Sequence, residues 1–256
     1  MRNRLKEQLK RRDFVVGTWL TTNSLDVAEL LATSGFDFLV FDMEHAPLTY
    51  ESVQTLMQAT NGSTVTPIVR VAWNDPVLIK LALDIGSYGL LIPSVNGKEE
   101  AEMAVRAGKY PPRGIRGVGP RRASDYYRSF KEYTSSADEE VLTIVQIEHV
   151  DAVKKIEEIA SVPGVDALFI GPADLTASMN LPGEYSHPKV VEAVNLVMDA
   201  SRKYDLPIGI HTGSADEANR RIQQGFRMIV VGTDVGFLAQ GSSETLKQIE
   251  KGKISE

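Results

Sequence analysis

The sequence contains no cysteine, and this absence removes several kinds of chemistry at once. Disulfide bonds, thiolate metal sites and cysteine nucleophiles are all excluded. Histidine is scarce, with four residues, and none of them stands in the His-x₃-His spacing of a structural zinc site. Long hydrophobic runs are also missing, because no stretch approaches the roughly 18 apolar residues that a membrane span requires.

An excess of positive charge is the next absence. Lysine and arginine total 28 against 34 acidic residues, which leaves a net charge of −6. Nucleic-acid binding usually relies on a positive field, so we expect no nucleic-acid partner. The first 14 residues, MRNRLKEQLKRRDF, are charged and contain no apolar segment, so no secretory signal is expected. We expect a soluble, cytoplasmic protein without a membrane partner.

Eight short apolar runs are present along the 256 residues. Most are continuously apolar rather than alternating, as expected of parallel strands that are covered on both faces. The predicted strands are Val15–Thr21, Phe36–His45, Pro67–Trp73, Gly89–Val95, Leu142–His149, Ala167–Asp174, Pro207–Thr212 and Met228–Thr233.

Helix signals stand between these runs. Pro76 and Pro188 occupy first helical positions, and Ser214 with Glu217 has the spacing of a capping box before Gly225. No glycine-rich dinucleotide fingerprint follows any strand. Eight alternating units predict an α/β fold, a (β/α)₈ barrel forming a single domain over residues 1–256.

One segment, residues 110–140, lacks clear periodicity. Such a long connection in a compact domain is usually functional. Between Lys109 and Lys131 it is rich in arginine. It has two interpretations: a solvated, partly helical surface loop, or a loop that binds anions or contacts another subunit. The arginines are Arg113, Arg116, Arg121, Arg122 and Arg128.

Polar side chains follow several predicted strands, where the active sites of such barrels lie. Glu148 and Asp174 end adjacent strands, so their carboxylates could share one divalent cation such as Mg²⁺ or Mn²⁺. The alternative is that both bind backbone amides. Because none of the 13 lysines occupies a strand end, a Schiff-base mechanism has no evident nucleophile. The other polar residues at strand ends are His45, Arg70, His211 and Asp234.

Five motifs carry a family resemblance that runs from about Gly17 to Gly241. FDFLVFDMEHAP, PIVRVAWNDPVLIKLALDIG, YPPRGIRGVG, VQIEH and FIGPADL resemble the class II pyruvate aldolases of the HpcH/HpaI family. The resemblance implies a lyase that reversibly cleaves 4-hydroxy-2-oxo acids to pyruvate and an aldehyde. It also implies a divalent metal, with Mg²⁺ or Mn²⁺ favoured and Co²⁺ and Zn²⁺ as further candidates, and a homohexamer.

The resemblance assigns roles to individual residues. His45 resembles the catalytic base, Arg70 the arginine that stabilises the transition state, and Asp84 the acid that raises the basicity of the histidine. Glu148 and Asp174 resemble the metal ligands. The pyruvate-binding positions correspond to Arg70, Gln146, Ala173 and Asp174. Residues whose role stayed open are Trp19, Asp42, Glu44 and His211.

Two rival functions share some of these residues. A coenzyme A thioester lyase would keep the metal carboxylates but needs a nucleotide groove. A barrel that binds a keto acid without turnover needs no positioned base, so the combination of His45 with Arg70 argues against it.

Asp84 presents a geometric conflict. It ends the helix after the third strand, at the bottom of its own barrel, whereas His45 lies at the top. A strand of about six residues separates these faces by roughly 20 Å. If Asp84 acts on the base, it must come from a neighbouring subunit, and the basic residues 109–131 could border the same shared pocket.

Overall fold

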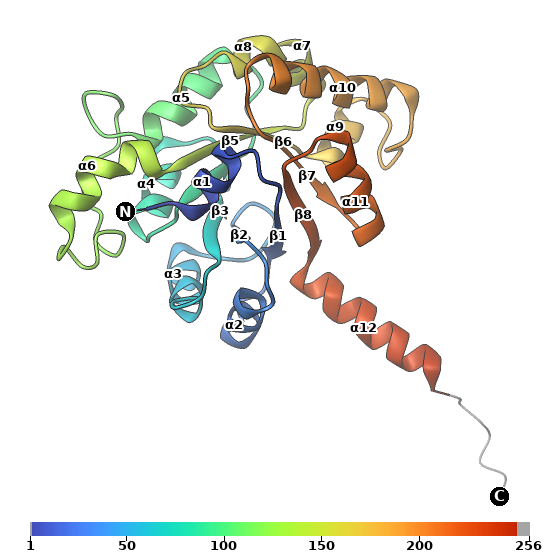
Figure 1. The fold of residues 1–256 in the computed structure, drawn as a ribbon, viewed down its shortest axis with the longest axis horizontal. Coiled ribbons are helices and arrows are strands. Elements are labelled where there is room, and N and C mark those ends of the chain that lie inside the picture. Colours follow the sequence, from blue (N-terminus) through green and yellow to red (C-terminus); the bar gives the residue numbers. More distant parts are fainter. Residues whose placement is uncertain (1, 250–256) are drawn as a thin grey trace, which may run out of the picture.

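Eight parallel strands form a closed barrel in the computed structural model (Figure 1). The structure describes residues 2–249. Neighbouring strands pair in sequence order, and β1 pairs with β8 to close the barrel. This confirms the predicted (β/α)₈ fold. The strands are β1 (Val15–Leu20), β2 (Phe38–Asp42), β3 (Thr66–Arg70), β4 (Gly89–Ile92), β5 (Leu142–Ile147), β6 (Ala167–Ile170), β7 (Ile208–Thr212) and β8 (Met228–Thr233).

The strands are buried on both faces because two apolar clusters enclose them. One cluster fills the barrel interior and includes Phe38, Ile68 and Phe169. It continues into Leu5 and Leu9 of helix α1 (Arg4–Lys10), which therefore closes the amino-terminal end of the barrel. The larger cluster lies between the strands and the surrounding helices. The barrel interior is therefore open only at its carboxyl-terminal end, among the described residues.

Helices connect successive strands. Ser24 caps the second helix, and Pro76 and Pro188 begin helices as predicted. The predicted capping box is half formed: Ser214 accepts from the Glu217 amide, while the Glu217 carboxylate accepts from the Gly213 amide. The helices are α2 (Leu25–Thr33), α3 (Tyr50–Ala59), α4 (Pro76–Asp84), α5 (Lys98–Gly108), α6 (Phe130–Glu140), α7 (Val150–Lys154), α8 (Ile156–Ala160), α9 (Pro172–Ser178), α10 (Pro188–Lys203), α11 (Ala215–Gln224) and α12 (Asp234–Gln248).

Helix α12 projects away from the barrel (Figure 1). Its apolar side chains have little cover within the chain: Leu238 is 74% exposed and Leu246 is 59% exposed. None of the helices in residues 2–249 combines the length and apolar character that a membrane crossing needs.

Six predicted strands were too long at their carboxyl ends: β1 by one residue, β5 by two, β2, β3 and β4 by three each, and β6 by four. β2 ends at Asp42, because the Asp42 carboxylate accepts hydrogen bonds from the amides of Glu44 and His45 and turns the chain. β6 ends at Ile170, and Asp174 lies in the first turn of α9. The side chains of Asp42 and Asp174 nevertheless lie at the carboxyl-terminal face of the barrel.

The segment without clear periodicity is only partly irregular. Residues 130–140 form α6, which its weak apolar pattern did not reveal. The segment is thus partly helical, as one of its two interpretations had it, but Arg116 is not solvated: it is 1% exposed and its guanidinium contacts the hydroxyl of Tyr133.

Candidate active site

Arg70, the last residue of β3, is held on several sides. Its Nε and Nη2 donate to the two carboxylate oxygens of Asp42, at 2.9 and 2.7 Å. Its Nη1 lies 3.1 Å from Oε2 of Glu44. Its guanidinium carbon lies 4.2 Å from the ring centre of Trp19. Since the side chain is 10% exposed, Arg70 is a fixed positive charge at the edge of the barrel.

Glu44 brings a second carboxylate to the same place. Burial raises the pKa of Glu44 to about 7, Arg70 opposes the increase, and Glu148 and Asp174 add to it. The raised pKa therefore reflects first the loss of water around Glu44 and then the nearby carboxylates of Glu148, Asp42 and Asp174. Oε2 of Glu44 is buried without a hydrogen-bond partner among the described residues.

Glu148 follows β5 directly and is oriented by its neighbours. Its Oε1 accepts from the Ser94 amide at 2.8 Å, and its Oε2 accepts from Nε2 of Gln146. Gly171 leaves space beside this pair, because a Cβ there would lie 3.0 Å from Cβ of Glu148 and 3.2 Å from Nε2 of Gln146. The sequence left open whether these carboxylates bind backbone amides instead of a metal. At Glu148, one of the two oxygens, Oε1, does bind a backbone amide.

A cavity of about 700 Å³ opens at this end of the barrel, and an adjoining one of about 360 Å³ contains Glu148. His45 and Asp174 line both cavities. The predicted residues that line the larger cavity are His45, Arg70, Gln146, Ala173 and Asp174. In residues 2–249, no group of three or more His, Asp and Glu side chains is arranged as a metal site.

His45 is the most accessible of the predicted catalytic groups. Its side chain is 61% exposed, and Nε2 lies 3.8 Å from Oε2 of Glu44. This separation is too long for a short hydrogen bond between the Glu44 carboxylate and the imidazole. No acid therefore holds His45 through a short hydrogen bond in the described part of the chain.

Trp19 and His211, whose roles the sequence left undecided, line the larger cavity. Nε1 of Trp19 donates to Nδ1 of His211 at 3.1 Å. Burial lowers the pKa of His211, so its imidazole is neutral and can accept this bond. Sequence reasoning missed Tyr185, Glu217 and Arg221, which also line the cavity and follow no strand directly.

Two residues from strand ends or helix ends do not join the cavity. Asp234 accepts from the amides of Thr21 and Thr22, at 3.0 and 2.8 Å, so it fixes the β1 end to α12. Asp84, at the end of α4, is bound by Nη2 of Arg116 at 2.7 Å. Neither residue lines either cavity beside His45.

Comparison with known proteins identifies relatives across nearly the whole chain. The family model described as HpcH/HpaI aldolase/citrate lyase matches residues 15–240. A 4-hydroxy-2-oxo-heptane-1,7-dioate aldolase of Klebsiella pneumoniae is 42% identical, over 94% of this chain and 92% of that protein. A 2-dehydro-3,6-dideoxy-6-sulfogluconate aldolase of Pseudomonas putida is 39% identical, over 93% of both.

A solved structure from Burkholderia cenocepacia, an HpcH/HpaI aldolase/citrate lyase family protein, superimposes with a TM-score of 0.93 at 36% identity. The superposition covers 96% of this chain and 98% of that one. The family match, the relatives and the barrel geometry agree. This chain belongs to the HpcH/HpaI aldolase/citrate lyase family.

Proposed function

We propose that the protein reversibly cleaves 4-hydroxy-2-oxo acids to pyruvate and an aldehyde in the 700 Å³ cavity, and that the reaction depends on a divalent cation. The observation that carries the proposal is the fixed Arg70 guanidinium beside clustered carboxylates in one cavity with an accessible imidazole. Relatives about 40% identical that are named aldolases support carbon–carbon lyase chemistry.

The residues at the cavity fit a divalent cation. Burial raises the pKa of Glu44, and Glu148 and Asp174 add to the increase. Oε1 of Gln146 is buried without a hydrogen-bond partner among residues 2–249. Glu148 and Asp174 would hold the ion, and their oxygen ligands favour Mg²⁺ or Mn²⁺, with Co²⁺ and Zn²⁺ as further candidates. When bound, the cation supplies Lewis-acid stabilisation of negative charge on a 2-oxo oxygen.

Arg70 would bind the 2-oxo acid and stabilise the charge that develops as the C3–C4 bond breaks. Its rigid fork needs no reorganisation at that moment, because Asp42 and Trp19 already hold it. The amides of Ala173 and Asp174, in the first turn of α9, have no acceptor within the helix and would donate to the substrate carboxylate together with Gln146.

His45 would accept the proton of the C4 hydroxyl group. Its exposed ring faces the cavity, and a neutral imidazole can take that proton directly or through water. In the addition direction, the same ring returns the proton to the new hydroxyl group.

Asp84 would support His45 of a neighbouring subunit in a homo-oligomer, with a hexamer as the expected state. Asp84 lies outside its own chain's cavity and is presented with Arg116 at the end of α4. The apolar residues of α12 are exposed in the single chain, which favours assembly through that helix.

A coenzyme A thioester lyase is the alternative that the family description allows. The citrate lyase from Burkholderia xenovorans is 17% identical with a TM-score of 0.59, which shows a shared fold alone. A keto-acid-binding barrel without turnover is the other alternative, and it leaves His45 without a role.

Release of pyruvate tests the proposal. Purified protein should liberate pyruvate from a synthetic 4-hydroxy-2-oxo acid, lose that activity with chelator, and regain it with Mg²⁺ or Mn²⁺. Borohydride should trap no adduct. A reduced pyruvate adduct on a lysine would overturn the mechanism, and binding without cleavage in the presence of metal would favour the binding barrel.

A further inference from the structure

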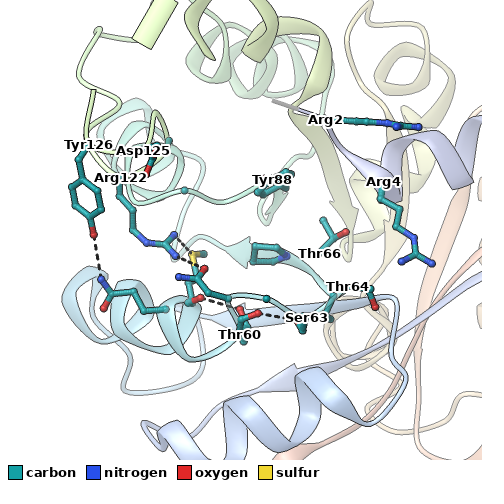
Figure 2. A pocket seen from close by; sticks show the side chains of 18 residues that line it. Arg2, Arg4, Thr60, Ser63, Thr64, Thr66, Tyr88, Arg122, Asp125 and Tyr126 are labelled. Atoms are coloured by element: carbon teal, nitrogen blue, oxygen red, sulfur yellow. Dashed lines mark hydrogen bonds between the residues drawn. The ribbon is translucent and has the colours of Figure 1, made fainter. Parts of the chain in front are cut away.

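A separate cavity, of about 510 Å³, lies at the opposite, amino-terminal end of the barrel (Figure 2). Its walls are the end of α3, the start of β3, the N-terminal segment and the loop that contains Arg122 and Tyr126. Hydroxyl side chains line its floor, where Figure 2 labels Thr60, Ser63 and Thr64. The hydroxyls of Thr60 and Ser63 donate to backbone carbonyls, which leaves their oxygens as acceptors for a ligand. None of the residues assigned to the reaction lines this cavity.

Positive charge dominates the lining. Arg122 lies on one side and Arg2 and Arg4 on the other (Figure 2). Arg2 pairs with Glu7, but neither Arg4 nor Arg122 forms an ion pair with a carboxylate in the described part of the chain. Among the described residues, Asp125 is the only acidic one in the lining, and it is already paired with Arg128. The cavity therefore has cationic groups without anionic partners, in a chain with a net charge of −6.

Arg122 is held in place rather than free at the surface. Its Nη1 donates to the carbonyl of Ile85 at 2.8 Å, and its Nη2 donates to Oδ1 of Asn61 at 3.2 Å. Gly86, at φ +102°, lies directly beneath it, because a Cβ there would be 2.6 Å from Nη1. The partners of Arg122 are neutral, and half-burial lowers its pKa.

At one edge of the lining, a hydrogen bond joins the loop to α3, from Nε2 of Gln58 to the hydroxyl of Tyr126 at 3.3 Å. A cavity of this volume is within the usual range for small-molecule sites, and it is much larger than one inorganic anion needs. Arginine suits phosphate, and hydroxyl side chains suit a hydroxylated carbon chain.

We propose that this cavity binds a phosphorylated polyhydroxy metabolite, with the phosphate at Arg122 and the hydroxylated body along Thr60 and Ser63. Bound there, the ligand joins the N-terminal segment, α3 and the loop. It stabilises the fold through mass action, because only the folded chain presents these groups together.

Calorimetric titration and thermal melting with glucose 6-phosphate, inorganic phosphate and glucose test the proposal. The protein should be saturated with pyruvate and Mg²⁺, so that the catalytic cavity does not compete. Glucose 6-phosphate should bind and raise Tm, inorganic phosphate should bind more weakly, and glucose should not bind. If inorganic phosphate binds as tightly as glucose 6-phosphate, the hydroxylated body has no subsite and the proposal is wrong.

Two variants separate binding from a structural role. Arg122→Gln should weaken glucose 6-phosphate binding about tenfold or more, as expected for the loss of a charge-assisted contact. Since Arg122 also joins the loop to α4, Arg4→Gln provides a second variant on an exposed side chain, and it should weaken binding several-fold with Tm of the free protein unchanged.

Arg121→Gln is the matched control, because Arg121 is exposed, adjacent in sequence and outside the lining. Its binding should equal that of the wild type. Absence of binding to the wild type at millimolar concentration would overturn the proposal. So would equal affinity in the wild type, Arg122→Gln and Arg4→Gln, which would leave Arg122 only its structural role.

Discussion

At the scale of single residues, the main feature is how Arg70 is held. Nε and Nη2 of Arg70 both donate to Asp42, Nη1 lies beside Glu44, and the ring of Trp19 covers the face of the guanidinium. A buried cation loses its hydration, so these partners must replace water. The sequence marked Arg70 but left Asp42 and Glu44 undecided between structural and supporting roles.

Asp42→Asn should reduce the free energy of unfolding by about 3 kcal/mol, because it leaves a buried guanidinium without its main counter-charge. Urea denaturation measures the change. Asp151→Asn is the control, since Asp151 pairs with Lys154 at 2.7 Å on an exposed surface, and no measurable loss is expected there. Equal losses in the two variants would contradict the importance of burial.

Glu44 predicts a pH dependence in metal-free protein. Its pKa is about 7 in the folded chain against an ordinary value of 4.5, so between these values the folded state holds a proton that the unfolded chain releases. Stability from this group is therefore present below pH 4.5 and is lost as the pH rises towards 7.

Glu44→Gln should remove that loss. In thermal melts with chelator, the Tm of the variant minus the Tm of the wild type should increase from pH 5 to pH 7 and then stay constant. Glu51→Gln, on the exposed surface of α3, should run parallel to the wild type. Parallel curves for Glu44→Gln as well would contradict the raised pKa.

At the scale of elements, α12 differs from the other long helices. Asp234 ties its start to β1 and Val235 borders the catalytic cavity, but the rest projects from the barrel with apolar side chains exposed (Figure 1). A helix of this kind needs cover from outside its own chain. It therefore links the proposed assembly to the wall of the cavity.

Leu238→Glu should shift the protein to smaller species in sedimentation velocity, because it places a charge where a 74% exposed leucine would be buried by a partner. Ser243→Glu, an exposed polar position on the same helix, should leave the assembly unchanged. If the Leu238→Glu protein sediments as the wild type does, α12 is not the contact.

At the scale of the whole molecule, the two ends of the barrel have different tasks. The carboxyl-terminal end has the catalytic cavity, while Asp84, Arg116 and the cavity beside Arg122 belong to other parts of the surface. If assembly places Asp84 beside a neighbour's His45, two defective chains can restore one site.

Asp84→Ala and His45→Ala should each lower kcat, the latter by about 10²–10⁴-fold as for loss of a general base. Dissociated and reassembled together, the two variants should regain part of the wild-type activity, because some sites then combine an intact Asp84 with an intact His45. Aldol cleavage by the separate and mixed proteins measures this. No recovery in verified mixed oligomers, or a fully active monomer, would contradict a shared site.

The sequence by itself determined the barrel, the family and the aldolase chemistry, and the structure and the relatives confirm these predictions. Strands buried on both faces are apolar along their whole length, so the sequence shows where they lie and in which order they follow one another. His45, Arg70 and Asp174 were found because the carboxyl ends of parallel strands meet at one face. The roles of these residues, the metal and the hexamer remain predictions.

Only the tertiary structure decided what each charge meets. The pairs Asp42–Arg70 and Asp84–Arg116 join residues 28 and 32 positions apart, and no local pattern encodes such a distance. The raised pKa of Glu44 depends on its burial and on carboxylates that other elements bring close. Arg122 lacks an anionic partner because its hydrogen bonds go to neutral groups just after α3 and α4. Local periodicity records burial, whereas the partner of a buried charge is set by how separate elements pack.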